Sequence, residues 1–353
     1  MEFALDDAQL ALQATARAVL RSLAPDESTD DQWQQFVELG WVGLLVPQAN
    51  GGAGVGLLEM MVVLEEMGRL PLSAPFLSSA VLATLAATRL GLDERLSSMA
   101  AGKSRGTVAI DEDGHGDVID RIRTRASRKS GTWRLTGSKP IVLDGDSADW
   151  VLIPARTQHG ISTFLVERPL ATTIDTLDVT RRITRMEFSD TVAEPVGPDA
   201  DHTAVWRRVV DDGAVALCAE MLGAMEAGFD LAIGYAKDRV QFERPIATFQ
   251  ATKHKAADML ERIELSRVGV HYAAWASDAE DDVRAEATAM AKSFVGRAAN
   301  EVTGEAIQIH GGVGFTWECD AHLYYRRAKS NDLLLGYHGA WRHRVADSYL
   351  RTG

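Results

Sequence analysis

The stretch that decides the fold is Arg239-Val-Gln-Phe-Glu-Arg-Pro-Ile-Ala-Thr-Phe-Gln250, and a second motif, Gln308-Ile-His-Gly-Gly-Val-Gly-Phe315, follows about sixty residues later. Both motifs lie among stripes of apolar residues at helical spacing. The stripes are Leu217, Met221, Ala224, Gly228, Leu231 and Tyr235; Ala256, Met259, Leu260 and Ile263; and Ala287, Met290, Ala291, Phe294, Ala298, Val302, Ala306 and Ile309. Long stripes rich in Ala and Gly predict closely packed helices, so we expect residues 201–353 to form a four-helix bundle.

The preceding region, residues 106–200, has the pattern of a β-structure. Its short runs are rich in β-branched and aromatic residues, and Gly- and Asp-rich turns separate them. The expected strands cover residues 107–110, 132–135, 141–143, 150–153 and 162–166. Several short strands at this spacing predict a compact antiparallel barrel or sandwich.

The first part of the chain, residues 1–105, has a helical pattern with a strong helix over residues 57–68. Acidic residues are expected to cap two further helices, at Asp6 or Asp7 and at Asp30 or Asp31. The whole chain is therefore predicted to be an α+β protein, with a helical domain, a β-domain and a helical bundle in this order.

Composition narrows the possible functions. The 353-residue chain carries a net charge of −13 with acidic and basic residues intermixed, which argues against nucleic-acid binding. Its two cysteines, Cys218 and Cys319, stand in no CxxC or Cys/His cluster, so we expect no metal site and a reducing, cytoplasmic setting. The acidic N-terminus lacks the pattern of a secretory signal. No uninterrupted apolar run reaches roughly 18 residues, so no membrane span is expected.

Four stretches carry a resemblance to the acyl-CoA dehydrogenase family. They begin ELGWVG at residue 38, WRLTGSKP at residue 133, RVQFERPIATFQ at residue 239 and AIQIHGGVGF at residue 306. The resemblance covers nearly the whole chain, and the last two motifs are highly specific in combination. It implies the family's succession of a helical domain, a β-domain and a helical bundle, with FAD as cofactor and an acyl-CoA thioester as substrate.

In the family, the last two motifs hold the adenosine-pyrophosphate end of a flavin whose ring sits mainly on a neighbouring subunit. Arg239 would then donate charge-assisted hydrogen bonds to phosphate oxygens. The other implied contacts are apolar or stacking surface from Phe242 and Phe249, hydrogen bonds from Gln250 and Gln308, and close backbone approach at Gly311 and Gly312.

Three departures from the family pattern concern the other end of the flavin. The family's Thr-Glu-Pro-x-x-Gly-Ser-Asp loop, which lines the flavin and the thioester, corresponds to residues 108–117, where the motif is lost. A family Trp that packs on the flavin is replaced by Ile141, and the hydroxyl near flavin N5 is replaced by Leu143, which has no donor. The catalytic glutamate corresponds to Leu335, which cannot abstract a proton.

A subset of the family places its base at the start of the first C-terminal helix, which corresponds to Gly213 here. Asp212 is adjacent, and Glu220 lies about two helical turns further on. We expect Asp212 to cap this helix and Glu220 to be a helix-face or interface charge. These two residues are nevertheless the candidates for a base in this chain.

The losses are sorted by function, which predicts a division of labour between subunits. This chain would supply the adenosine side of the FAD site to a related partner that carries the ring pocket and the glutamate. Such an arrangement resembles the α2β2 acyl-CoA dehydrogenases of actinobacteria, some of which act on steroid side-chain CoA thioesters. The implied reaction is α,β-desaturation, with an electron-transfer flavoprotein as electron acceptor.

Two alternatives remain open. One is a self-sufficient homo-oligomeric dehydrogenase or oxidase that uses Asp212 or Glu220 as its base. The other is a non-catalytic scaffold subunit that binds no flavin.

Overall fold

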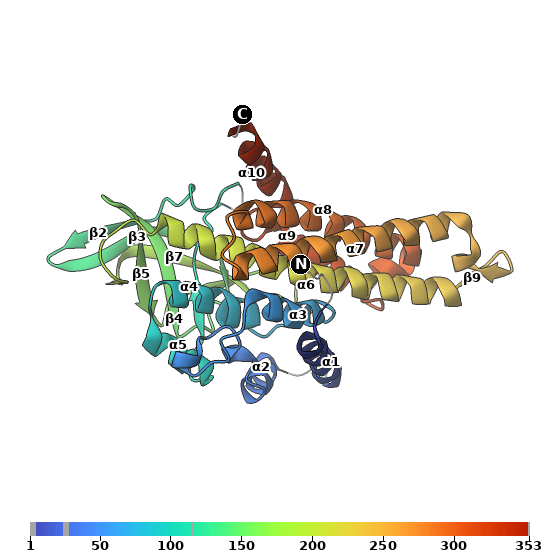
Figure 1. The fold of residues 1–353 in the computed structure, drawn as a ribbon, viewed down its shortest axis with the longest axis horizontal. Coiled ribbons are helices and arrows are strands. Elements are labelled where there is room, and N and C mark those ends of the chain that lie inside the picture. The colour runs from blue at the N-terminus through green and yellow to red at the C-terminus, as the bar shows by residue number, and fades with distance from the viewer. Residues whose placement is uncertain (1–4, 24–27, 114–115, 352–353) are drawn as a thin grey trace.

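The N-terminal part of the chain is helical in this computed structural model, which describes residues 5–23, 28–113 and 116–351. The first helices surround one side of the long C-terminal helices (Figure 1). Their bounds are α1 (Asp7–Ser22), α2 (Thr29–Glu38), α3 (Leu57–Gly68), α4 (Thr84–Arg89) and α5 (Asp93–Ala100), with short turns η1 (Trp41–Gly43) and η2 (Gln48–Asn50) and a π-helical segment η3 (Phe76–Ala83).

The N-terminal cap was predicted correctly for α1 and wrongly for α2. Asp6 accepts a hydrogen bond from the Gln9 amide at 2.8 Å and caps α1, as predicted. The prediction for α2 was wrong, because Ser28 caps it by accepting from the Asp31 amide at 3.2 Å. Asp30 and Asp31 instead lie in the first turn, where their charges favour the helix dipole.

The middle of the chain forms a mostly antiparallel sheet in the order β6-β7-β3-β2-β4-β5-β8, with β1 parallel to β4. The strands are β1 (Gly106–Val108), β2 (Arg125–Lys129), β3 (Thr132–Leu143), β4 (Trp150–Thr157), β5 (Gly160–Glu167), β6 (Thr172–Ile174), β7 (Ile183–Val192) and β8 (Glu194–Pro195). Two separately expected strands, 132–135 and 141–143, are one strand, β3. A register shift between Lys139 and Val142 accommodates Pro140, which has no amide hydrogen for the ladder.

Alternation along β4 divides the sheet between two cores. Val151 and Ile153 point into a core that belongs to the sheet itself. Leu152, between them, joins the large core that the sheet shares with the N-terminal and C-terminal helices. Successive side chains of a strand point to opposite faces, so one strand can serve both cores.

The C-terminal helices form the predicted bundle. Figure 1 shows α6 and α7 running side by side to a small hairpin at β9, at the end of the molecule furthest from the large sheet, and α10 projecting from the body. The elements are α6 (Thr203–Asp238), β9 (Val240–Gln241), β10 (Arg244–Pro245), η4 (Ile246–Thr248), α7 (Gln250–Asp278), α8 (Arg284–His310), η5 (Gly311–Phe315), α9 (Ala321–Leu333) and α10 (His338–Arg351).

The helix α3 lies in unusually close contact with α6. A Cβ atom at Gly223 would come within 1.8 Å of the Glu65 carbonyl oxygen, and one at Gly68 within 2.1 Å of the Glu220 carbonyl oxygen. Glycine at both crossing points therefore allows the two backbones to touch. No helix among the described residues combines the length and the apolar character that a membrane crossing requires.

Candidate functional site

The first motif forms the tip of the α6–α7 pair. Arg239 follows the last residue of α6 as its C-cap, and its carbonyl oxygen accepts a hydrogen bond from the Ile246 amide at 2.9 Å, which closes the loop. The hairpin turns at Phe242 and Glu243, whose φ angles of 53° and 65° lie in the left-handed region. A two-residue turn with positive φ at both positions is the type I′ turn that suits a β-hairpin.

Aromatic and cationic groups are placed around this loop. The rings of Phe242 and Phe249 meet edge to face with centroids 6.2 Å apart, and the Arg244 guanidinium lies 4.2 Å from the centroid of Phe249. Phe242 is nevertheless 86% exposed, and Arg239 and Gln250 are exposed as well. The loop thus presents a cation, an amide and an apolar ring to whatever lies beyond this chain.

The second motif lies at the end of α8 and is brought to the same end of the bundle. The ring of His310, the last residue of α8, stacks on Tyr235 of α6 at a centroid distance of 4.6 Å. Gly311 then turns the chain with a φ of 64°. Cβ atoms at Gly311 and Gly312 would meet no other atom within 4 Å, so the backbone here is open to a ligand.

The expected nucleotide-binding residues therefore fall into two exposed segments at one end of the bundle. Gln308 is exposed on the last turn of α8, and Gly312 is exposed in η5. His310 is buried, and its Nδ1 atom lies 2.7 Å from the Ala306 carbonyl oxygen, which agrees with a structural role. Among the described residues, no cluster of three His, Cys, Asp or Glu side chains has the geometry of a metal site.

The positions of the three family departures converge in space. Ile141 and Leu143 on β3 and Leu335 after α9 all line one small cavity of about 30 Å³. Further apolar side chains from η3, β1 and α6 line it as well, and the buried Asp111, which follows β1, is its one acidic lining residue. Since a water molecule needs roughly 10–15 Å³ of such space, the cavity holds only one or two waters and no acyl chain or flavin ring.

Leu335 lies where the two base positions that the resemblance implies come close together. A Cβ atom at Gly213, the alternative base position on α6, would lie 2.8 Å from Leu335 Cδ1 and 2.6 Å from Leu82 Cδ2. Leu335 itself adopts a φ of 57°, and the Trp341 indole N–H donates to its carbonyl oxygen at 3.1 Å. Two sequence positions 122 residues apart thus point at one spot, and neither position carries a carboxylate.

The proposed cap at Asp212 is corrected by the structure. α6 begins at Thr203, so Asp212 lies in the interior of the helix rather than at its start. It is only 2% exposed and forms ion pairs with Arg89 and with Arg208, and the Ser277 hydroxyl donates to it at 2.6 Å. Its oxygens join three helices, which leaves it no access to a substrate.

Glu220 is also held within the protein. It is 5% exposed, forms an ion pair with Arg181 and accepts a hydrogen bond from the side-chain amide of Asn331 at 2.9 Å. Arg327 and Asp178 form a second buried ion pair. The two pairs influence each other, since the charge of Asp178 also raises the pKa of Arg181. Glu220 is therefore a buried charge that ties α6 to α9 and to the loop before β7, not an interface charge.

Hydrogen bonds and an ion pair of Glu112, which the sequence did not predict, hold the loop at the position of the family's flavin-lining motif. Glu112 accepts hydrogen bonds from the amides of Arg123 and Thr124 and forms a 2.7 Å ion pair with the fully buried Lys139. Burial lowers the pKa of Lys139 to about 8, although Glu112 opposes this effect. No local sequence pattern indicates this contact, because Lys139 stands among other polar residues of β3, such as Arg134 and Ser138.

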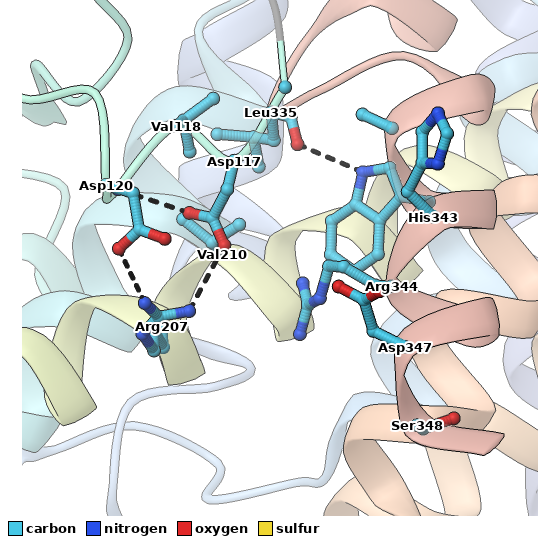
Figure 2. Close-up of a pocket in the computed structure, with 13 residues that line it drawn as sticks. Asp117, Val118, Asp120, Arg207, Val210, Leu335, His343, Arg344, Asp347 and Ser348 are labelled. Carbon is cyan, nitrogen blue, oxygen red and sulfur yellow. Dashed lines mark hydrogen bonds and ion pairs between the residues drawn. The ribbon is translucent and has the colours of Figure 1, made fainter. Parts of the chain in front are cut away.

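An open cleft of about 550 Å³ also ends at Leu335 and was not foreseen (Figure 2). Its walls come from the segment between β1 and β2, from α6 and from α10. Figure 2 shows Arg207 reaching from α6 to Asp117 and Asp120, with donor–acceptor distances of 3.1 and 2.7 Å.

A helical region, a sheet and a helical bundle in this order along the chain, together with the two motifs at the far end of the bundle, are typical of the acyl-CoA dehydrogenase class of protein. The chain belongs to the acyl-CoA dehydrogenase family, since the family's N-terminal domain profile matches residues 6–95 and its C-terminal domain profile matches residues 203–350. It is 33% identical to the acyl-CoA dehydrogenase IpdE2 of Mycobacterium tuberculosis over 92% of this chain and 89% of that protein.

Two solved structures are similar over nearly their whole length. One is a chain of the Tcur3481–Tcur3483 steroid acyl-CoA dehydrogenase G363A variant, with a TM-score of 0.89 and 28% identity, covering 98% of both chains. The other is a chain of the ChsE4–ChsE5 complex from Mycobacterium tuberculosis, with a TM-score of 0.88 and 27% identity, covering 100% of both.

Proposed function

We propose that this chain is the flavin-ring-deficient subunit of a heteromeric, FAD-dependent acyl-CoA dehydrogenase. It contributes the adenosine-pyrophosphate side of the FAD site to a related partner that carries the ring pocket and the catalytic glutamate. The observation that carries the proposal is that Ile141, Leu143 and Leu335 line one mostly apolar cavity of about 30 Å³, with Gly213 next to Leu335. The chain thus leaves little space at the position of the reacting centre, while the residues proposed to bind the nucleotide are exposed.

The residues present fit the nucleotide end of FAD. Arg239 supplies a cation for the pyrophosphate, and the open backbone at Gly311 and Gly312 admits close approach of its oxygens. Gln250 and Gln308 offer both donors and acceptors for ribose and phosphate groups. Bound flavin supplies the hydride acceptor in such enzymes, and this chain's part is to hold and orient it.

The reaction of the complex is α,β-desaturation of a CoA thioester, with removal of the α-proton by the partner's glutamate. A substrate carrying a steroid side chain is supported by the similarity to a steroid acyl-CoA dehydrogenase and to a two-component complex. An electron-transfer flavoprotein accepts the electrons in this proposal. The neighbours that are complexes also favour α2β2 assembly.

Counting flavin per chain tests the proposal. The chain purified alone is expected to contain almost no FAD, whereas the co-expressed complex contains FAD and desaturates the thioester. Stoichiometric FAD and turnover in the chain alone would instead establish the self-sufficient enzyme.

An Arg239→Ala variant of the complex separates the proposal from a scaffold role. A hydrogen bond to a charged group contributes about 1.5–3 kcal/mol, so FAD should bind roughly 10- to 100-fold more weakly. Lys237→Ala, which removes an exposed charge two residues away, is the matched control and should change nothing. Equal FAD affinity in the two variants would favour the scaffold.

A further inference from the structure

The β-domain carries a basic stretch that the proposed function does not use. Residues 121–134 contain six arginines and lysines and no aspartate or glutamate, although the whole chain has a net charge of −13. Four arginines, Arg121, Arg123, Arg125 and Arg156, line one open groove of about 390 Å³. This volume lies within the range of roughly 300–1,000 Å³ that is typical of small-molecule sites. We call this site the arginine groove.

Few carboxylates neutralise the charges of the arginine groove. Arg121 and Arg123 share the carboxylate of Asp113, at 2.8 and 4.0 Å, and the Arg123 side chain is 80% exposed. Asp120, the one acidic residue among those described around the groove, is paired with Arg207 of α6 at 2.7 Å. The groove therefore keeps an excess of positive charge.

Two of its arginines, Arg125 and Arg156, are paired with no carboxylate in the part of the chain that the structure describes. The Arg125 side chain there has neither an ion pair nor a hydrogen bond, and Arg156 donates to the carbonyl oxygens of Ile122 and Asp120. Arg125 in β2 and Arg156 in β4 are register partners, so their side chains leave the same face of the sheet side by side. Like charges in such positions destabilise a sheet, and a bound anion would remove this cost.

Part of the arginine groove is fixed in shape before any ligand binds. Two backbone carbonyl oxygens accept hydrogen bonds from Arg156, at 2.5 and 2.9 Å, and so orient its guanidinium. Glu112 accepts hydrogen bonds from the amides of Arg123 and Thr124, and its ion pair with the buried Lys139 anchors this backbone to β3. Groups that are ordered beforehand lose less conformational entropy when they bind a ligand.

The residues around the arginine groove indicate the class of ligand. A guanidinium presents several N–H donors in a planar fork, which matches the oxygens of a phosphate group. Four neighbouring guanidiniums suit a ligand with several adjacent negative charges better than a single carboxylate. Ile122 is the one apolar residue among those described here, so the groove offers no aromatic ring on which a base could stack and no enclosure for an acyl chain.

We propose that the arginine groove binds a polyphosphate anion through its phosphate chain, either inorganic polyphosphate or the triphosphate of a nucleotide. The bound anion neutralises the pair of Arg125 and Arg156 and thereby stabilises the junction of β2 and β4. The groove shares only Asp120 with the open cleft at Leu335, and the inference does not rest on the proposed function.

Isothermal titration calorimetry of the full-length chain tests the site with sodium tripolyphosphate as the probe. At an ionic strength of about 0.15 M, one tripolyphosphate should bind per chain, at least about tenfold more tightly than inorganic phosphate. ATP that binds within about threefold of tripolyphosphate makes a nucleotide the source, whereas ATP that binds at least about tenfold more weakly makes it inorganic polyphosphate. Tighter binding of CoA than of tripolyphosphate would overturn the inference, because the groove would then hold the phosphates of a substrate.

Matched glutamine variants locate the bound anion. Arg125→Gln and Arg156→Gln should each weaken tripolyphosphate binding by about tenfold or more, because hydrogen bonds between charged groups are lost. Arg185→Gln removes an exposed cation of β7 outside the groove and should bind tripolyphosphate as the unmodified chain does. Equal losses in all three variants would show a general attraction to positive charge and would refute the site.

The melting temperature of the chain provides a second readout. Arg125→Gln should raise the melting temperature of the ligand-free chain, because the repulsion between Arg125 and Arg156 is removed. The same variant should lose the increase that tripolyphosphate causes in the unmodified chain. A lower melting temperature of the ligand-free variant, or an undiminished increase with tripolyphosphate, would contradict the inference.

Discussion

Leu335, which the resemblance aligns with the family's catalytic base, has a backbone conformation that L-residues rarely adopt, with a φ of 57°. Leu335 is 9% exposed and lines the small cavity together with Leu82. Introducing a carboxyl group here places it in a mostly apolar pocket that Asp111 also lines and that no cationic side chain lines. We therefore expect Leu335→Glu to lower the free energy of unfolding by at least about 2 kcal/mol, measured by urea denaturation.

The same variant should not become a dehydrogenase on its own. The cavity that it faces stays too small for a substrate, since Ile141 and Leu143 remain in place. Leu335→Met, which conserves volume, is the control and should cost less than about 1.5 kcal/mol. Desaturation by the Leu335→Glu chain in the absence of its partner would contradict the interpretation that the cavity at Leu335 is too small for a substrate.

Glu65 makes the stability of the chain dependent on pH. Burial, and after it the neighbouring Glu226 carboxylate, raises the pKa of Glu65 to about 7 from an ordinary value of 4.5, against the opposing effect of Arg267. The folded chain thus keeps a proton that the unfolded chain releases. Its stabilising contribution is fully present below pH 4.5 and is lost as the pH rises towards 7, by about 3 kcal/mol at most.

Glu65→Gln should remove this loss. Its free energy of unfolding relative to the unmodified chain should increase between pH 4.5 and pH 7.5, because glutamine stays neutral. Glu264→Gln changes an exposed carboxylate that contacts the same Arg267, at 3.6 Å, and serves as control. A parallel pH profile for the Glu65→Gln variant and the unmodified chain would show that Glu65 does not carry the effect.

Among the elements, the crossing of α3 and α6 has the least room for change. A methyl group at Gly223 would overlap the Glu65 carbonyl oxygen, which belongs to a helix backbone and cannot rotate away. Gly223→Ala should therefore destabilise the chain by about 3 kcal/mol or more, measured by urea denaturation.

Gly234 on the same helix provides the matched control. A Cβ atom there would meet nothing within 4 Å, so Gly234→Ala should be neutral or stabilise the chain by about 0.5–1 kcal/mol. Equal effects of the two substitutions would show that helix propensity, rather than the close crossing, governs these positions.

Sequence patterns predicted the elements better than their ends. The helix over residues 57–68 was confirmed at both bounds, because its apolar spacing is strong and continuous. The start of α6 was missed by several residues at Asp212, since an acidic residue within a helix looks the same in sequence as one at its cap. Only the positions of Arg89, Arg208 and Ser277 reveal that Asp212 serves a buried network.

For the molecule as a whole, the resemblance indicated which residues belong to the candidate site, but not which other side chains lie around them. Ile141, Leu143 and Leu335 were identified as departures one by one. That they share one wall, closed by Leu77 and Leu82 of a helical segment far away in sequence, depends on tertiary packing. The open cleft at Leu335 also depends on where α10 lies, which no local pattern specifies.

Large apolar side chains are exposed near the proposed nucleotide-binding end of the molecule. Phe315 is 74% exposed and Trp317 is 68% exposed, and both follow the glycines of the second motif. Arg326 lies 5.1 Å from the Trp317 ring centroid and donates to the carbonyl oxygen of Leu177, which is itself 50% exposed. Exposed aromatic residues beside an arginine are typical of the centre of a protein interface.

We therefore predict that Trp317→Ser weakens assembly with the partner subunit. Loss of an aromatic side chain at the centre of an interface costs about 2 kcal/mol or more, which corresponds to at least a tenfold weaker complex. Analytical ultracentrifugation of the two-component complex measures this change. Leu10→Ser, which alters a 48% exposed residue on α1, should leave assembly unchanged. Equal assembly of both variants would place the partner on another face, and the exposed flavin-binding residues would then need a different explanation.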